Sequence, residues 1–228
     1  MVEFLFLDLD DTILDFGMAE RSALRKTLQQ VGIEPTETIL QRYHVINIAH
    51  WQMLERGELT REQVLVRRFA VLFEEFGRSA DPALCARVYH DFLAQGHDFL
   101  PGALEAVQRL HKKYRLFVAS NGTAHVQEKR LSDTALYPYF EDIFISELLG
   151  ADKPSPEFFA RSFARIPDFD PARAMIVGDS LTSDIRGGKN AGIRTCWVNP
   201  TGKAAPDDLR PDHEIASLTE LEALLERL

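Results

Sequence analysis

The sequence predicts an α/β fold, with a Rossmann-like parallel sheet core and an inserted α-helical domain. Five short apolar runs, each followed by polar or small residues, have the length and composition of strands buried in a parallel sheet. These runs are Phe4–Leu9, Leu116–Ser120, Ile143–Ser146, Met175–Gly178 and Arg194–Val198. Helical patterns lie between most of them, and alternating strands and helices are typical of a doubly wound sheet.

The helices expected in this core carry apolar residues at helical spacing on one face. They are predicted at Gly102–Lys113, Glu157–Ala164, Ser183–Ala191 and Leu218–Leu228. Residues 199–214 contain three prolines and several polar residues. We therefore expect a surface loop before the last helix.

One long segment interrupts the alternation. No strand-like run appears between the first strand and about Leu116, and the residues between are helical in period. Candidate helices there are Ala19–Val31, Glu37–Leu54, Arg61–Phe76 and Pro82–Gln95. We predict a core of residues 1–16 and 96–228 and a helical insertion of residues 17–95. The alternative is a long crossover without a function, but insertions at the carboxyl ends of strands usually shape a binding site.

The composition limits the partners of the chain. Its 228 residues carry a net charge of -9, which argues against a nucleic-acid polymer as partner, because such binding needs many Lys and Arg contacts to phosphate. The first apolar run is too short to cross a membrane. Two cysteines, Cys85 and Cys196, imply no disulfide framework, so a cytoplasmic location is expected.

Acidic residues follow two of the predicted strands. Asp8 and Asp10 end the first strand, and Asp179 and Asp184 follow the fourth. Two strand ends of one parallel sheet meet at the same edge, which is where α/β folds bind ligands. Clustered carboxylates repel one another unless a cation or shared protons intervene, and a hard divalent cation is the simplest solution. A solvated acidic turn and a helix-capping Asp184 are the structural alternatives.

Two further strand ends carry groups suited to an anion. Ser120, Asn121 and Gly122 follow the second strand, where a hydroxyl and backbone amides supply donors, although the same tripeptide is also an ordinary turn. Lys153 follows the third strand. A cation there can offset the clustered acids and bind a phosphate, whereas a single lysine is more often a solvated surface residue.

Together these residues resemble the four motifs of the haloacid dehalogenase-like (HAD) hydrolase superfamily, in the same order. Asp8 and Asp10 match the first motif, Ser120 the second and Lys153 the third, and the fourth is matched by Asp179 with Asp184. The insertion resembles the helical type-1 cap of that superfamily. The stretches Ser183–Gly192, Thr195–Asn199 and Trp51–Thr60 are similar to its pyrimidine 5′-nucleotidase branch.

The resemblance implies a magnesium-dependent phosphatase. Asp8 is expected to attack phosphorus and form an aspartyl-phosphate, while Asp10 acts as general acid and then as general base. Mg²⁺ would be held by Asp8, the backbone carbonyl of Asp10 and Asp179, with Asp184 acting through water or as an anchor. Ser120, Lys153 and backbone amides near Asn121 would hold the phosphate oxygens.

The expected substrate is a small phosphorylated metabolite, with a pyrimidine nucleoside monophosphate preferred. Trp51 could stack on a nucleobase, although a core tryptophan is equally consistent with the sequence. Helical spacing places Asn47 on the same face as Trp51. Phosphatases of sugar phosphates or phosphoglycolate, and a phosphomutase, share the same acids and stay open.

Three other classes fit the sequence less well. Haloacid dehalogenases lack an acid at the position of Asp10, because a leaving halide needs no proton. Phosphonate cleavage would need a lysine in the cap to form an imine, and the only lysine there is Lys26. A non-catalytic receiver-like module would be much shorter, with its phospho-accepting acid in the middle of the domain and not at position 8.

Overall fold

The computed structural model describes all 228 residues of the chain. They form two compact units, the first made of residues Met1–Asp15 and His97–Leu228 and the second of Phe16–Gly96. The first is called here the sheet unit and the second the helical unit. The boundaries expected from the sequence lie one residue away from these.

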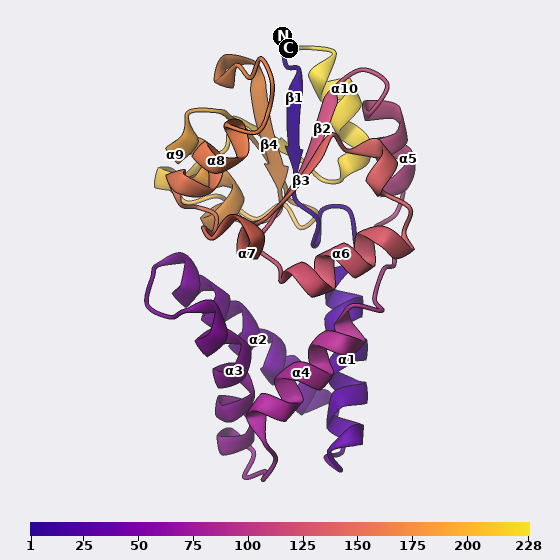
Figure 1. Ribbon diagram of the computed structural model, residues 1–228, viewed down its shortest axis with the longest axis vertical. Helices are drawn as coiled ribbons and strands as arrows, with labels where there is room; N and C mark the ends of the chain where they lie inside the picture. Colours follow the sequence, from indigo (N-terminus) through magenta and orange to yellow (C-terminus); the bar gives the residue numbers. More distant parts are fainter. The chain divides into compact units, whose positions relative to one another are not determined.

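The sheet unit contains six parallel strands in the order β3-β2-β1-β4-β5-β6 (Figure 1). The strands are β1 Phe4–Leu7, β2 Arg115–Ser120, β3 Asp142–Ile145, β4 Ala174–Gly178, β5 Arg194–Val198 and β6 His213–Ile215. In the sheet, β1 lies between β2, which is the next strand along the chain, and β4. The carboxyl ends of β1 and β4 therefore mark the switch point of the sheet, where ligands bind in folds of this kind. The predicted fold class is confirmed.

Helices cover both faces of this sheet (Figure 1). The helices of the sheet unit are α5 Ala103–Leu110, α6 Ala124–Asp133, α7 Ser146–Leu149, α8 Pro156–Phe163, α9 Arg186–Ala191 and α10 Leu221–Leu225. Alternate residues of each strand face opposite sides, so β1 contributes to two separate cores. Leu5 and Leu7 pack with the apolar faces of α5 and α10, whereas Phe4 and Phe6 pack with the phenylalanines of α8.

Two expectations for the strands were wrong. β1 ends at Leu7 and not at Leu9, because the chain turns after Asp8 and residue Asp11 adopts a left-handed backbone (φ 52°). β6 lies at the end of the segment predicted to be a loop. This three-residue edge strand is too short to show an alternating pattern, and only Ile215 in it is apolar.

Two predicted helices also differ from the structure, and the first of them is the helix 183–191. It starts as a single π turn, Leu181–Ile185, and becomes regular only as α9. The last helix is also shorter than predicted, since a 3₁₀ turn at Leu218–Glu220 precedes α10. Further 3₁₀ turns occur at Tyr137–Tyr139, Pro171–Arg173 and Asp207–Leu209.

The helical unit consists of four helices, close to the predicted ones. They are α1 Phe16–Gln30, α2 Glu37–Glu55, α3 Arg61–Glu75 and α4 Pro82–Leu93. Side chains cap three of them, since Thr36, Thr60 and Asp81 each accept a hydrogen bond from a first-turn amide. None of the helices in the chain combines the length and apolar character needed to cross a membrane.

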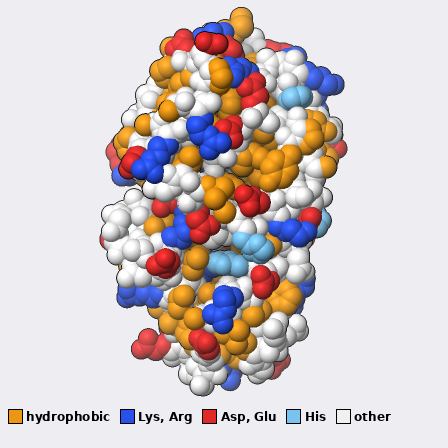
Figure 2. Space-filling view, in the orientation of Figure 1, with side chains coloured by type: hydrophobic (Ala, Val, Ile, Leu, Met, Phe, Trp, Pro, Cys, Tyr) orange, Lys and Arg blue, Asp and Glu red, His pale blue; other side chains and the backbone are white.

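The surface seen in Figure 2 carries acidic and basic side chains in a mixed pattern among apolar ones. On that face the basic side chains form no continuous stripe of the kind that binds a nucleic-acid backbone.

Candidate active site

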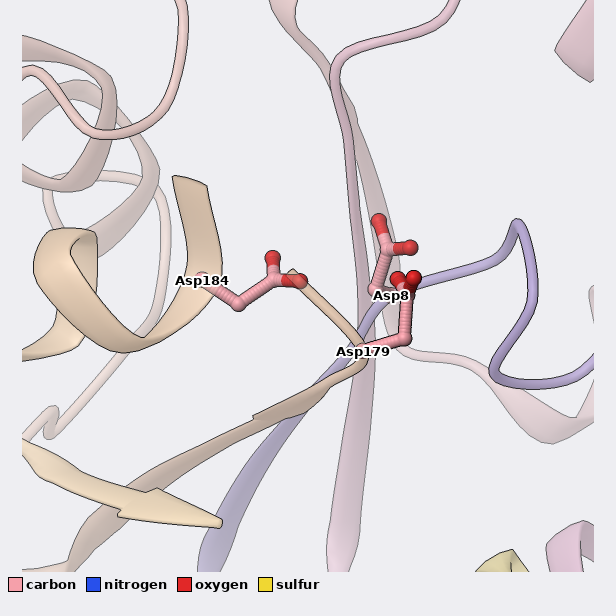
Figure 3. A group of neighbouring side chains, drawn as sticks. All are labelled: Asp8, Asp179 and Asp184. Atoms are coloured by element: carbon pink, nitrogen blue, oxygen red, sulfur yellow. The ribbon is translucent and has the colours of Figure 1, made fainter. Parts of the chain in front are cut away.

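Three carboxylates meet at the carboxyl edge of the sheet. Asp8 follows β1, Asp179 follows β4, and Asp184 lies in the π turn behind β4. One oxygen of each lies within 4.8 Å of the others, and Figure 3 shows Asp184 directed toward the adjacent carboxylates of Asp8 and Asp179. β1 and β4 are hydrogen-bonded neighbours, so the switch point of the sheet brings these acids together.

Lys153, which follows α7, is buried among these acids. Its Nζ donates to Asp8 Oδ1 at 2.7 Å, to Asp184 Oδ1 at 2.6 Å and to the Ala119 carbonyl at 2.5 Å. An ammonium group has three N–H donors, and all three are accepted here. The lysine therefore neutralises part of the acid cluster and fixes the orientation of Asp8. A contact to a substrate oxygen would require one of these donors to be shared or released.

The electrostatics of the cluster call for further positive charge. Burial raises the pKa of Asp8 to about 7, against the opposing effect of the Lys153 ammonium. Burial also raises the pKa of Asp179 well above its usual value, and repulsion by Asp8 and Asp184 adds to this. Burial alone would lower the pKa of Lys153, but the attraction of Asp184 and Asp8 outweighs it and raises that pKa. One ammonium thus does not balance three carboxylates.

The donor set fits a divalent cation such as Mg²⁺. Three carboxylates that converge within one coordination sphere are hard oxygen ligands, and hard cations of this type prefer them. A cation would also remove the repulsion that raises the pKa of Asp8 and Asp179. The side chain of Asp10 lies outside this group of three, and the prediction assigned only its backbone carbonyl to the metal.

Asn121 ties the end of β2 to the lysine. Its Nδ2 donates to the Lys153 carbonyl at 2.8 Å, and its Oδ1 accepts from the Lys153 backbone amide at 2.8 Å. This reciprocal pair fixes the backbone from which the Lys153 side chain projects. The side chain of Asn121 therefore positions a neighbouring residue, and the role expected for backbone amides near Asn121 in phosphate binding stays a prediction.

Ser120 and Asp10 are connected through one buried glutamine. Gln127 Nε2 donates to Ser120 Oγ at 2.9 Å and to Asp10 Oδ2 at 2.7 Å. Arg130 forms an ion pair with the other oxygen of Asp10. Both Gln127 and Arg130 come from α6, the helix that follows Ser120.

The carboxyl end of β4 is supported by the neighbouring strand. Trp197 of β5 donates its indole N–H to the Asp179 carbonyl at 2.7 Å, and its side chain is buried. On the other side of the same strand end, Gly178 leaves room for Asp184. A Cβ atom at Gly178 would lie 2.1 Å from Asp184 Oδ2, so only glycine permits this close approach.

Trp51 belongs to α2 of the helical unit and is partly exposed. The Arg61 guanidinium lies over its ring, 5.5 Å from the centroid. Asn47 lies one turn before Trp51 in the same helix, and its side chain is buried inside the unit. Its amide donates to Glu20 at 2.7 Å and accepts from Arg68 at 2.7 Å, so Asn47 is part of the interior.

Sequence reasoning missed Gln127, Arg130 and Trp197. The first two had a usable signal, because they lie three residues apart on the helix that begins after Ser120, so they share one face. Trp197 had a weaker signal, since it lies one residue before the end of β5, the strand next to β4. In each case the contact partner is distant in sequence, and only the fold shows which polar group is met.

Comparisons with known proteins identify the family of the chain. A family model for haloacid dehalogenase-like hydrolases matches residues 2–192. A Bacillus subtilis protein described as the HAD-hydrolase YfnB is 42% identical over 97% of this chain and 94% of its own. Its crystal structure, bound to magnesium, superposes with a TM-score of 0.94 and covers 98% of both chains.

Two other relatives bear the name pyrimidine 5′-nucleotidase. PynA of Streptococcus pneumoniae is 36% identical, covering 96% of this chain and 93% of its own. YjjG of Escherichia coli is 29% identical, covering 98% of this chain and 97% of its own. The predicted resemblance and the prediction of a phosphoric monoester hydrolase are thereby confirmed. The chain belongs to the haloacid dehalogenase-like hydrolase family.

Proposed function

We propose that this protein is a Mg²⁺-dependent phosphatase that works through an aspartyl-phosphate on Asp8 and prefers pyrimidine nucleoside monophosphates. The observation that carries the proposal is the convergence of the carboxylates of Asp8, Asp179 and Asp184 around the Lys153 ammonium at the switch point. Few arrangements other than a phosphoryl-transfer site need a buried nucleophilic carboxylate beside a cation site.

The cation would be held by the carboxylates of Asp8 and Asp179 and by the backbone carbonyl of Asp10, with Asp184 as ligand or anchor. When bound, it offsets the negative charge of the phosphate and of the nucleophile. Lys153 already orients Asp8 through the hydrogen bond to its Oδ1. The second oxygen of Asp8 is then the atom available for attack on phosphorus.

The reaction proceeds in two transfers. In the first, an oxygen of Asp8 forms a bond to phosphorus, the bond to the leaving oxygen breaks, and that oxygen takes a proton from Asp10. In the second, water attacks the phosphorus, Asp10 takes a proton from the water, and the bond to Asp8 breaks to release phosphate. Asp10 thus returns to its protonated state. Its side chain is 27% exposed, which leaves an edge open to substrate or water.

The preference for nucleotides rests on two observations of different kinds. The relatives PynA and YjjG are named pyrimidine 5′-nucleotidases. In the helical unit, which we propose acts as the cap, Trp51 offers an aromatic face suited to stacking on a base.

Asp10, which supplies a proton to an alkoxide leaving group, favours phosphatase over dehalogenase activity.

A substrate panel tests the proposal. Nucleoside monophosphates, sugar phosphates, phosphoglycolate and p-nitrophenyl phosphate are compared by kcat/KM from free phosphate release, with Mg²⁺ and with excess chelator. We expect hydrolysis only with Mg²⁺, pyrimidine nucleotides among the best substrates, and no phospho-enzyme in an Asp8→Asn variant. Full activity in chelator would exclude the metal. A tenfold advantage of a sugar phosphate or phosphoglycolate, about 1.4 kcal/mol in transition-state binding, would exclude the nucleotidase assignment.

A further inference from the structure

Both oxygens of Asp10 are held by side chains of one helix. Oδ1 pairs with the Arg130 guanidinium, and Oδ2 accepts from Gln127 Nε2 at 2.7 Å. Arg130 Nη1 also donates to Gln127 Oε1 at 3.1 Å. The two side chains therefore brace each other as well as Asp10. A carboxylate that is held at two points by buried groups cannot rotate freely about its side-chain bonds.

Gln127 also holds Ser120. Its Nε2 has two hydrogens, and the structure assigns one to Asp10 and one to Ser120 Oγ, at 2.9 Å. The Gly122 amide donates to the same hydroxyl oxygen at 3.0 Å. A hydroxyl oxygen has two acceptor lone pairs, so both are engaged. The Ser120 hydroxyl hydrogen is then directed elsewhere, as a donor suited to a phosphate oxygen.

The surroundings keep this arrangement rigid. Gln127 and Arg130 are 1% and 0% exposed, although glutamine and arginine are usually surface residues. Gly122 allows the close approach of the glutamine, since a Cβ atom at Gly122 would lie 2.3 to 2.7 Å from its side chain. Ordering two long polar side chains in the interior costs conformational entropy and desolvation. Their position next to the reacting groups indicates a function beyond packing.

We propose that Gln127 and Arg130 are positioning residues for phosphoryl transfer, which aim Asp10 at the leaving oxygen and hold Ser120 for the phosphate. This inference rests on the proposed function and deepens it. Its consequence concerns the leaving group. An alkoxide needs a proton from Asp10 as the bond to phosphorus breaks, whereas p-nitrophenolate leaves without one. The two residues should therefore matter most for alkyl esters.

The test compares two esters in variants that remove the contacts. Gln127→Met and Arg130→Met keep the approximate side-chain volume and delete the donors. The alkyl ester is the one that the wild-type protein hydrolyses fastest in the panel above, and the aryl ester is p-nitrophenyl phosphate. Values of kcat/KM are compared, because they report the steps up to the first phosphoryl transfer.

For each variant we expect kcat/KM to fall at least about tenfold more for the alkyl ester than for the aryl ester, a loss typical of groups that orient a reacting residue. Matched controls are Gln108→Met and Lys129→Met. Gln108 donates to the Tyr139 hydroxyl, and Lys129 forms an exposed ion pair with Asp133 on the same helix as Arg130. In both controls the ratio of the two esters should stay within about twofold of wild type.

A second measurement separates the two residues. Inorganic phosphate, used as a competitive inhibitor, should bind severalfold more weakly to Gln127→Met, which loses the Ser120 contact, and should be weakened less in Arg130→Met, which keeps that contact. Equal weakening in both variants would refute the assignment of Ser120 to Gln127. Arg130 is wholly buried, so Arg130→Met could fail to fold, which a thermal melt would show. In that case Arg130→Lys replaces it, and the ratio of kcat/KM for the alkyl ester to kcat/KM for the aryl ester should again fall.

The outcomes distinguish the two proposals. If the wild-type protein hydrolyses neither ester, the phosphatase proposal fails. If it hydrolyses both and the variants lose the same factor on each, the positioning role is excluded and Gln127 and Arg130 serve stability alone.

Discussion

The Asp8 carboxylate lies where the protein disfavours its charge and at the same time fixes its position. Burial and neighbouring acids raise its pKa to about 7, while Lys153 holds one of its oxygens. A carboxylate in this setting is poorly solvated. It is therefore reactive toward the phosphorus of a phosphate ester when a cation offsets the negative charge. Asp179, whose pKa is also raised, shares this dependence on a cation. Proton and metal therefore compete for the same oxygens.

This competition predicts the pH dependence of magnesium binding. An acid whose pKa rises from 3.8 to about 7 on folding makes the native state hold more protons than the unfolded chain between those values. Its contribution to the stability of the metal-free protein therefore falls as pH rises through that window. Mg²⁺ binds the deprotonated form, so the rise in Tm on adding Mg²⁺ should be small at pH 5.5 and grow up to about pH 8.

Paired thermal melts with Mg²⁺ and with chelator at each pH check this expectation. The difference in Tm between the two melts removes the contribution of groups that titrate elsewhere in the chain. In Asp8→Asn the pH dependence of the difference should be weaker. A magnesium-induced shift that is constant from pH 5.5 to 8 would contradict the competition.

At the scale of elements, the site is built from strand ends that are braced from the side. β1 and β4 deliver Asp8 and Asp179, and the neighbouring β5 supports β4 through the bond from the Trp197 indole to the Asp179 carbonyl. Asn121 likewise connects the end of β2 to the backbone of Lys153 through two hydrogen bonds. Such supporting contacts determine how precisely the charged groups converge, and losing them lowers the affinity for a metal ion.

The substitution Trp197→Phe tests this support. It keeps an aromatic ring in the core and removes the indole N–H, so the Asp179 carbonyl loses its partner and the turn that carries Asp179 loosens. We expect the Mg²⁺ concentration for half-maximal hydrolysis of p-nitrophenyl phosphate to rise about tenfold, with a similar weakening when binding is followed by the magnesium-induced shift in Tm.

Trp51→Phe is the matched control, because it makes the same chemical change in the helical unit. Its magnesium midpoint should equal that of the wild-type protein. An unchanged midpoint in Trp197→Phe would show that β5 contributes packing alone to this end of β4.

The sequence predicted the elements best where apolar spacing repeats over several turns or a strand is fully buried, as in β4 or α3. It failed at β6, whose three residues are decided by pairing with β5 and not by their own composition. At the site, Asp8 and Asp179 were found because they follow strands directly, and Lys153 because it lies in the connection after β3. The roles of Gln127 and Arg130 depend on where α6 packs after Ser120, which no local pattern specifies.

At the scale of the whole molecule, the chain divides chemistry and the proposed recognition between two units. The acids, Lys153 and Ser120 all belong to the sheet unit, whereas Trp51 belongs to the helical unit. The crystal structure of YfnB bound to magnesium is reported to reveal interdomain movement. Under the proposal that the helical unit of this chain acts as a cap, changes in that unit should alter specificity and leave the chemistry of small esters intact.

Trp51→Ala is the sharpest test of this division. The Arg61 guanidinium lies over the Trp51 ring and restrains its orientation, which favours a fixed stacking platform over a mobile side chain. If a base stacks on this ring, the variant should lose about 1 to 3 kcal/mol of binding to pyrimidine nucleotides, which corresponds to a fall of about five- to 150-fold in kcat/KM.

p-Nitrophenyl phosphate, which has no base, should lose less than about threefold, and Trp51→Phe should retain most of the nucleotide activity because it keeps an aromatic face. Equal losses on both esters would show that Trp51 stabilises the helical unit and does not bind the base. In that case the preference for nucleotides must come from other residues, because a loss of stability does not distinguish one phosphate ester from another.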